Sequence, residues 1–456
     1  MPTYKTPNVY VEEISTFPPS VSEVSTAIPA FIGYTQKAQR GSEDLTNKPT
    51  RISSLLEYET LFGTANASDF VVTTKKNDTT QVEEISAITE PQLKYLIYYA
   101  LRLYFDNGGG STYIISVGNY SKSVSKADFE KGLSALKKED EPTLILLTDA
   151  VNLVEDDYYA LCQAALLQSN LLKDRFAIFD ILPDKTSDTL STSGVTKFRE
   201  GIGTDYLKYG AAYYPYLQTS LNYYYTDDSV TIDPGETSTK LTSIKTNKTD
   251  LYNKIKTELD KKRVILPPSA AVAGVYARVD RDRGVWKAPA NVSLASVIGP
   301  TVKITNEEQE DLNVDPTAGK SINAIRSFTG KGTLIWGART LAGNDNEWRY
   351  IPVRRLFNLI EESIQKATSF VVFDANNAIT WLKVKTLIES YLEGLWRQGA
   401  LAGNTPEQAY FVNIGLGKSM TAQDILEGRL IVEIGIAAVR PAEFIILKFS
   451  HKLQEA

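Results

Sequence analysis

The sequence has 456 residues, of which 43% are hydrophobic, so it can bury a large core divided over roughly two to four domains. The formal net charge of −6 gives no basic field for nucleic acid, and no run of about 18 uncharged apolar residues is present to cross a membrane. One cysteine, Cys162, and one histidine, His451, exclude intrachain disulfides and Cys/His zinc sites and disfavour a histidine-dependent catalytic triad. The N-terminus lacks the charged-then-apolar order of a secretory signal, so we expect no export by that route.

The first 29 residues predict an extended arm. A β-prone run at residues 8–14 lies between prolines, which cannot continue a strand ladder. A strand this close to a terminus is an association hazard unless it pairs with something. We therefore expect residues 1–29 to form an exchange arm that adds a strand to a neighbouring copy. Its pairing residues would be Val9, Tyr10 and Val11, and its hinge would be Pro18 and Pro19.

Residues 30–220 predict an α/β domain. Apolar runs typical of buried strands occur at residues 30–35, 113–117, 143–147, 176–180 and 211–214, and helical patterns occur at residues 52–63, 93–105, 128–136, 158–172 and 195–201. Strands that are apolar throughout and alternate with helices indicate a parallel sheet covered on both faces. The polar stretch between about residues 65 and 90 predicts a surface loop or a hairpin.

Two further segments follow. Residues 221–262 are rich in Thr, Lys and Asp and predict a polar surface insertion, with helical character at residues 251–259. Residues 263–456 predict a second, C-terminal α/β core domain. Its expected strands are residues 322–328, 333–337, 370–373, 409–412 and 430–438. We expect one helix that begins at Pro352 and a second, long helix that ends at Gly399.

The chain ends on a second β-prone run, residues 444–449, which Pro441 separates from the strand at residues 430–438. We expect this last run to leave its own domain and complete a sheet in a neighbouring copy, with Pro441 as its hinge. The exchanged residues would be Phe444, Ile445, Ile446 and Leu447. With both ends exchanged, the protein would be a lattice subunit.

Three patterns resemble catalytic motifs, and each has a better structural interpretation. The run at residues 330–333, Gly-Lys-Gly-Thr, lacks the first glycine of a phosphate-binding loop and predicts a hairpin turn. Asp280 and Asp282 have metal-site spacing, but neighbouring arginines favour a salt-bridge cluster. The glycines at residues 108–110 follow a helix and predict its end. We expect no enzyme activity, metal or cofactor, although a soluble α/β enzyme whose terminal strands close its own sheet remains the alternative.

Several stretches together resemble one known family, the contractile tail sheath proteins of phages and of extracellular contractile injection systems. They are residues 6–13, 267–278, 283–291, 322–326, 336–340, 350–356 and 441–444. The resemblance implies a structural subunit of a six-start helical sheath that surrounds an inner tube and contracts on a baseplate signal. It also implies a core sheet that the terminal strands of neighbouring copies complete.

The resemblance further implies partners and a location. The partners would be copies of the same chain, the inner tube protein, and baseplate and terminal cap proteins, with no nucleic acid and no direct membrane insertion. The protein would assemble in the cytoplasm of the producing cell and then form part of a phage tail or tail-like particle, including extracellular ones. A baseplate-proximal minor sheath paralogue is the second alternative. On the helix from residue 381 to 399, Lys383, Lys385 and Arg397 are either a tube-facing surface or an ordinary solvated face.

Overall fold

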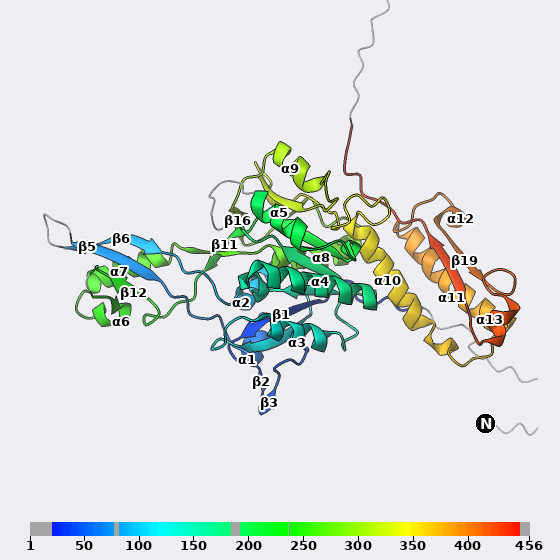
Figure 1. Ribbon diagram of the computed structural model, residues 1–456, viewed down its shortest axis with the longest axis horizontal. Coiled ribbons are helices and arrows are strands. Elements are labelled where there is room, and N and C mark those ends of the chain that lie inside the picture. Colours follow the sequence, from blue (N-terminus) through cyan, green and yellow to red (C-terminus); the bar gives the residue numbers. More distant parts are fainter. Residues whose placement is uncertain (1–20, 77–81, 184–191, 236, 447–456) are drawn as a thin grey trace, which may run out of the picture. The chain divides into compact units, whose positions relative to one another are not determined.

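The computed structural model describes residues 21–76, 82–183, 192–235 and 237–446 (Figure 1). The chain divides into two compact units. The body consists of residues 25–359 together with the segment that begins at Arg440, and the C-terminal unit consists of residues 360–439 together with the segment that ends at Val24. Both units mix helices and strands, which confirms the predicted α/β class. Within the described ranges, no helix is long and apolar enough to span a bilayer.

A nine-stranded sheet forms the centre of the body, in the order β15-β18-β17-β10-β9-β8-β1-β7-β4. In chain order its strands are β1 (Pro29–Thr35), β4 (Thr50–Ile52), β7 (Thr112–Asn119), β8 (Leu144–Leu147), β9 (Phe176–Asp180), β10 (Gly210–Tyr214), β15 (Val292–Ser293), β17 (Asn323–Phe328) and β18 (Gly332–Ile335). The six strands from β7 to β17 pair in parallel, as the uniformly apolar runs predicted. Their side chains are buried on both faces because helices cover both.

Successive side chains of β1 show the two layers. Phe31 packs into a core with α1 (Leu55–Phe62), α2 (Ile97–Asp106) and α8 (Ser269–Arg283), whereas Ile32 packs into a second core on the opposite face. That second core contains α3 (Lys126–Leu136), α4 (Glu155–Leu172) and α5 (Thr192–Gly201). The helices α2 and α8 pack closely, because a Cβ added at Gly274 would lie 2.5 Å from the carbonyl oxygen of Tyr104.

The predicted boundary at residue 263 does not separate two sheets. β17 pairs in parallel with β10, with Tyr213 opposite Asn323, so strands from both sides of that boundary belong to one sheet. The divide lies instead within α10 (Ile351–Ala367), where residue 359 belongs to the body and residue 360 to the C-terminal unit. The sequence pattern located the strands but could not show which strands pair.

The two polar stretches of the sequence form one small subdomain of the body. Its sheet has the order β13-β12-β5-β6. Of the two alternatives predicted for residues 65–90, a surface loop or a hairpin, the structure shows the hairpin, and β12 from the predicted insertion pairs with it. Its elements are β5 (Val71–Lys76), β6 (Glu83–Thr89), β12 (Thr231–Asp233), β13 (Thr239–Lys240), α6 (Leu241–Ile244) and α7 (Thr249–Leu259). The other short elements of the body are β2 (Gln39–Arg40), β3 (Glu43–Asp44), β11 (Leu217–Asn222), β14 (Arg263–Leu266), β16 (Val297–Pro300) and α9 (Asn306–Asn313).

The C-terminal unit contains a two-stranded antiparallel sheet next to the long helix α11 (Ala378–Arg397), which begins where the Asn377 side chain accepts the amide hydrogens of Ile379 and Thr380. Its other elements are α12 (Pro406–Ala409), β19 (Tyr410–Ile414), α13 (Ala422–Leu426) and β20 (Val432–Ile436).

The predicted strand at residues 370–373 is wrong. Ser369–Val371 is a single 3-10 turn that connects α10 to α11, and the amide of Asp374 donates to the carbonyl of Val371. A short apolar run has the same pattern in a strand and in a packed turn, and no strand lies alongside it within the described ranges.

Candidate intersubunit surfaces

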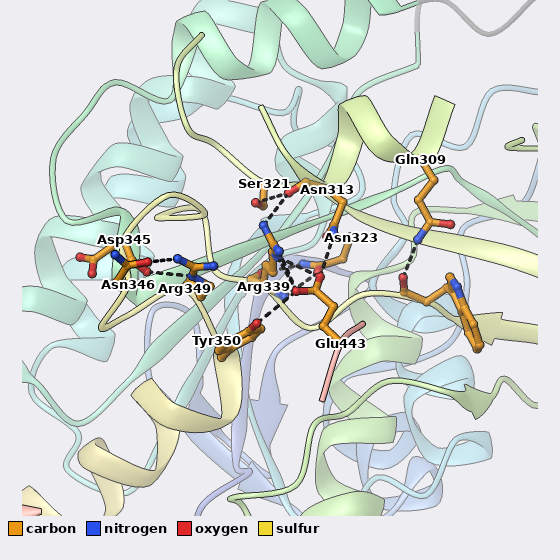
Figure 2. A network of polar contacts seen from close by, with 11 residues as sticks. Gln309, Asn313, Ser321, Asn323, Arg339, Asp345, Asn346, Arg349, Tyr350 and Glu443 are labelled. Atoms are coloured by element: carbon orange, nitrogen blue, oxygen red, sulfur yellow. Dashed lines mark hydrogen bonds and ion pairs between the residues drawn. The ribbon is translucent and has the colours of Figure 1, made fainter. Parts of the chain in front are cut away.

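The C-terminal segment is held to the body at Glu443. Figure 2 shows the Glu443 carboxylate among three side chains. Arg339 donates from Nε to Oε1 at 2.9 Å and from Nη2 to Oε2 at 2.6 Å, Asn313 donates to Oε1 at 2.7 Å, and Tyr350 donates to Oε2 at 3.1 Å. Burial acts to raise the pKa of Glu443, but the hydrogen bonds from Arg339 and Asn313 outweigh it and hold the pKa below its usual value. The carboxylate is therefore ionised at neutral pH and paired in two-pronged geometry.

Arg339 is itself fixed by the central sheet. Its backbone amide donates to the Asn323 side-chain oxygen at 2.8 Å, and the Asn323 amide group donates back to the Arg339 carbonyl at 2.8 Å and to the Ala212 carbonyl at 3.2 Å. Asn323 is the first residue of β17, and Ala212 lies in β10. The backbone of Arg339 is thus tied through Asn323 to two neighbouring strands of the nine-stranded sheet. Figure 2 shows Asn323 beside Arg339.

Beyond Glu443 the chain presents apolar side chains to solvent. Phe444, Ile445 and Ile446 are 69%, 79% and 78% exposed, and none of them belongs to a strand of the described chain. Three large apolar side chains in a row at this exposure are unusual on the surface of a single soluble chain. The predicted exchange residues Val9, Tyr10, Val11 and Leu447 and the predicted hinge residues Pro18 and Pro19 lie outside the described residues. Pro441 is described, and it lies in the connection between β20 and Glu443.

The sheet of the C-terminal unit is small enough to accept further strands. β19 and β20 pair from Tyr410 opposite Ile436 to Ile414 opposite Val432. Within the described residues no third strand joins them, although an isolated antiparallel bridge links Leu401 to Ala438 just beyond β20. A two-stranded sheet is marginal in water, and its outer backbone groups are available to added strands. Phe411 on β19 is 54% exposed, so the sheet also presents apolar surface. Sequence reasoning expected both strands but missed that they form one sheet, because their pairing is not encoded locally.

The three cations predicted for tube contact all lie on α11. Lys383 is exposed. Lys385 lies 3.5 Å from Glu389 and Arg397 lies 2.5 Å from Glu393, each one helical turn away. Two of the three positive charges are therefore largely balanced on the helix itself.

The buried charges of the body hold its elements together. Asp280 and Arg355 form a two-pronged pair, with Nη1 to Oδ1 at 2.9 Å and Nη2 to Oδ2 at 2.5 Å. The side chains are 6% and 3% exposed, and Arg281 and Asp282 form a separate exposed pair. The predicted salt-bridge cluster is thus confirmed only for Arg281 and Asp282. For Asp280 it is wrong, because this carboxylate is buried and its partner, Arg355, comes from α10 rather than from the adjacent arginines.

Two buried carboxylates that sequence reasoning missed follow β8 and end β9. Asp149 accepts the backbone amides of Leu96 at 2.5 Å and Tyr34 at 2.6 Å, and Asp180 accepts the amide of Ser269 at 2.8 Å and its hydroxyl at 2.6 Å. Burial raises the pKa of each aspartate to about 7. Asp180 thus receives the donors at the start of α8, and Asp149 receives one at the start of α2 and one from β1, so both carboxylates link a helix start to the central sheet.

The remaining motif interpretations also hold. Gly330 and Gly332 have φ of 77° and 76° in the hairpin turn between β17 and β18, and Gly108 has φ of 97° after α2.

Burial raises the pKa of the Cys162 thiol far above its usual value, so it remains an inert thiol. Within the described ranges, no group of His, Cys, Asp and Glu side chains could hold a metal ion.

Comparison with known proteins places these features in context. The phage tail sheath protein central domain matches residues 122–341, and the phage tail sheath C-terminal domain matches residues 343–452. The tail sheath protein of Enterobacteria phage T4 is 28% identical over 129 residues, which are 28% of this chain and 19% of that protein. A putative prophage major tail sheath protein of Pseudomonas aeruginosa strain UCBPP-PA14 is 26% identical over 184 residues, which are 39% of this chain and 44% of that protein. The matched part thus spans less than half the length of these curated relatives.

Solved structures match over nearly the whole chain. The sheath complex of the extracellular contractile injection system PVC, in its contracted state, has a TM-score of 0.67 at 32% identity and covers 99% of both chains. The helical sheath of the anti-feeding prophage, also contracted, has a TM-score of 0.65 at 34% identity and covers 99% of this chain and 100% of that one. A chain in the baseplate of the anti-feeding prophage matches with the same TM-score, identity and coverage.

Proposed function

This chain belongs to the contractile tail sheath family, and we propose that it polymerises around an inner tube as the subunit of a sheath whose contraction drives the tube through a target cell envelope. Two features carry the proposal: an exposed apolar segment that pairs with no strand of the described chain, and a two-stranded sheet that an added strand could extend. Phe444, Ile445 and Ile446 extend beyond Glu443 with no strand partner among the described residues, while the β19–β20 sheet has open edges.

Strand addition suits a contractile lattice. Main-chain hydrogen bonds across an added strand hold neighbours in a fixed mesh, and alternate side chains determine the register. Burying each of the three exposed apolar side chains would contribute about 1.5–3 kcal/mol. The N-terminal arm, through Val9, Tyr10 and Val11, would add a second strand from another neighbour, and Leu447 would extend the C-terminal one. The mesh would then stay intact while the bodies change their packing, with Pro18, Pro19 and Pro441 as hinge positions, and no nucleotide is needed if the two packings differ in energy.

Truncation tests the mesh. Removing residues 1–18, or all residues after Ala442, should leave soluble protein that forms no sheaths. Truncation after Glu443 is the sharper version, because it keeps the pair with Arg339 and removes only the segment proposed to form the exchanged strand. The measurement is negative-stain microscopy, in which the wild-type chain should give ribbed tubes. Normal sheaths from either truncation would contradict strand exchange, and discrete particles from the wild type would favour the soluble enzyme.

Lys383, Lys385 and Arg397 are the proposed tube contact. Of these, Lys383 is the most informative, because Lys385 and Arg397 each lie beside a glutamate of the same helix. Reversing all three charges should change co-assembly with the tube protein, whereas reversing Lys261, which pairs with Glu258 in the small subdomain, should not. Equal co-assembly of the two variants would remove α11 as the tube-facing surface.

The second candidate is a minor sheath subunit next to the baseplate; a chain in the structure of the anti-feeding prophage baseplate matches this chain as well as a chain of the helical sheath does. Deleting the gene for this chain separates the two roles. Particles without a cylinder would assign it to the main sheath, and particles with an intact cylinder but a defective end would assign it to the minor role. In either role its partners would be further sheath copies, the tube protein, and baseplate and cap proteins. Assembly would take place in the cytoplasm of the producing cell, and the finished particle would carry the chain outside it.

A further inference from the structure

We propose that Glu443 is the fixed origin of the exchanged C-terminal strand, so that Arg339, Asn313 and Tyr350 determine where that strand leaves the body. The inference rests on the proposed strand exchange and deepens it, because it names the residues that position the donor strand. It concerns the anchor of the strand rather than the sheet that receives it.

The geometry of the anchor favours one fixed position. The three donors come from different parts of the body: Asn313 ends α9, Arg339 follows β18, and Tyr350 immediately precedes α10 (Figure 2). A carboxylate that receives hydrogen bonds from three directions cannot slide by one residue and keep them, since the next side chain would point elsewhere. The neighbouring residues, Ala442 and Phe444, could not replace it because neither carries an acceptor in its side chain.

The anchor is also isolated along the chain. Within residues 440–446, all of them described, Glu443 alone makes hydrogen bonds, and Arg440, Ala442 and Phe444 are exposed. The Arg339 side chain is 4% exposed, so releasing Glu443 would leave a buried guanidinium without its anion. The held state is therefore strongly favoured over a tail that is free from residue 440.

The N-terminal segment has a matching attachment in the body. The Thr26 carbonyl accepts from Arg355 Nη2 at 2.8 Å and from the Thr143 hydroxyl at 3.0 Å, and Arg355 is held in turn by Asp280. The stretch from residue 339 to 355 thus supplies an arginine to each terminal segment. A force on either exchanged strand would therefore be transmitted through Arg339 or Arg355 to the central sheet rather than be taken up by a flexible linker.

One consequence concerns Pro441. It precedes Glu443, so a bend at Pro441 changes the connection between the C-terminal unit and the body but leaves the origin of the exchanged strand unchanged. The part of the chain that is free to extend to a neighbouring copy would begin at Phe444. Insertions before and after Glu443 should therefore have different effects, which a simple hinge at Pro441 does not predict.

The test places Gly-Ser either after Arg440 or after Glu443 in the full chain. Sheath assembly is measured by sedimentation, which gives the critical concentration, and by microscopy. The insertion after Arg440 should stay within about twofold of the wild type, whereas the insertion after Glu443 should raise the critical concentration about tenfold or more. Equal effects of the two insertions would overturn the proposal. Wild-type protein that forms no sheath would instead contradict the proposed function.

A second measurement needs no assembly. A dye on Ile446→Cys reports the local mobility of the tail, and the only native cysteine, Cys162, is buried. Glu443→Gln keeps the shape but loses the charge, so the dye anisotropy should fall in this variant. The matched control Glu258→Gln, which alters an exposed pair in the small subdomain, should leave the anisotropy unchanged. Identical anisotropy in Glu443→Gln and in the wild type would refute the anchor whether or not the protein forms sheaths.

Discussion

Removing the charge of Asp280 should destabilise the body by several kilocalories per mole. The carboxylate and Arg355 form two hydrogen bonds of 2.9 and 2.5 Å with almost no exposed surface. Arg355 also lies over the Tyr276 ring at 4.6 Å, so it has no route to water without disturbing α8. Removing one partner of such a pair typically costs about 3–5 kcal/mol, because the other charge stays buried and uncompensated. We place Asp280→Asn at about 3 kcal/mol, since asparagine retains one oxygen acceptor.

Asp282→Asn is the matched control, because it makes the same chemical change two residues further along α8. Asp282 pairs with Arg281 at 3.2 Å, but both side chains are more than half exposed, and exposed pairs contribute about 0–1 kcal/mol. Calorimetry of the full chain should show a Tm lower by about 4 °C for Asp280→Asn and by less than about 1.5 °C for Asp282→Asn. Equal melting temperatures for the two variants would refute the reasoning from burial.

Two further predictions follow from close contacts and from charge. Gly274→Ala should destabilise the body by about 2 kcal/mol or more, because its Cβ would lie 2.5 Å from the Tyr104 carbonyl oxygen. Gly394→Ala in α11, where a Cβ would have open space, should stabilise that helix by up to about 1 kcal/mol. Chemical unfolding measures both changes, and equal effects would contradict the close packing of α2 and α8. The Glu443 anchor should weaken in acid: its folded pKa is lowered, so its contribution is full above the ordinary value of about 4.3 and is lost as the pH falls through the lower folded value. The anisotropy of the dye at residue 446 should accordingly drop below about pH 4 in the wild type but not in Glu443→Gln, and a drop in both would assign the change to another group.

The sequence predicted most individual elements of the body, because buried parallel strands and capped helices have local signatures. The runs at residues 143–147 and 176–180 became β8 and β9, and the helix at residues 158–172 became most of α4. Pairing was not predictable in the same way. The pairing of β10 with β17 joins residues more than a hundred positions apart. Because of this pairing, residue 263 lies inside the body, and the observed domain boundary lies within α10. No local pattern encodes such a partner.

The candidate site shows the same limit. The β-prone run predicted that Phe444, Ile445 and Ile446 would pair with a sheet in a neighbouring copy, and in the structure these three side chains are exposed. The anchor next to them was missed, although Arg339 and Glu443 both lie in stretches that carry the family resemblance. No local sequence feature shows whether a glutamate in a polar connecting segment, such as Glu443, is hydrogen-bonded to the protein or exposed to water. Its role becomes visible only when the fold places Asn313 and Tyr350 around it.

The two units of the chain differ in how fully they bury their own large apolar side chains. The body encloses both faces of its central sheet, whereas the C-terminal unit leaves a set of large apolar side chains well exposed: Phe370, Val372, Phe373, Ile379, Leu382, Phe411, Leu416 and Leu426. These side chains are candidates for contacts with neighbouring copies in a sheath. Because the body folds around its own core, opening or closing contacts at the C-terminal unit need not unfold the subunit. A lattice built this way could rearrange its contacts during contraction while every body keeps its fold.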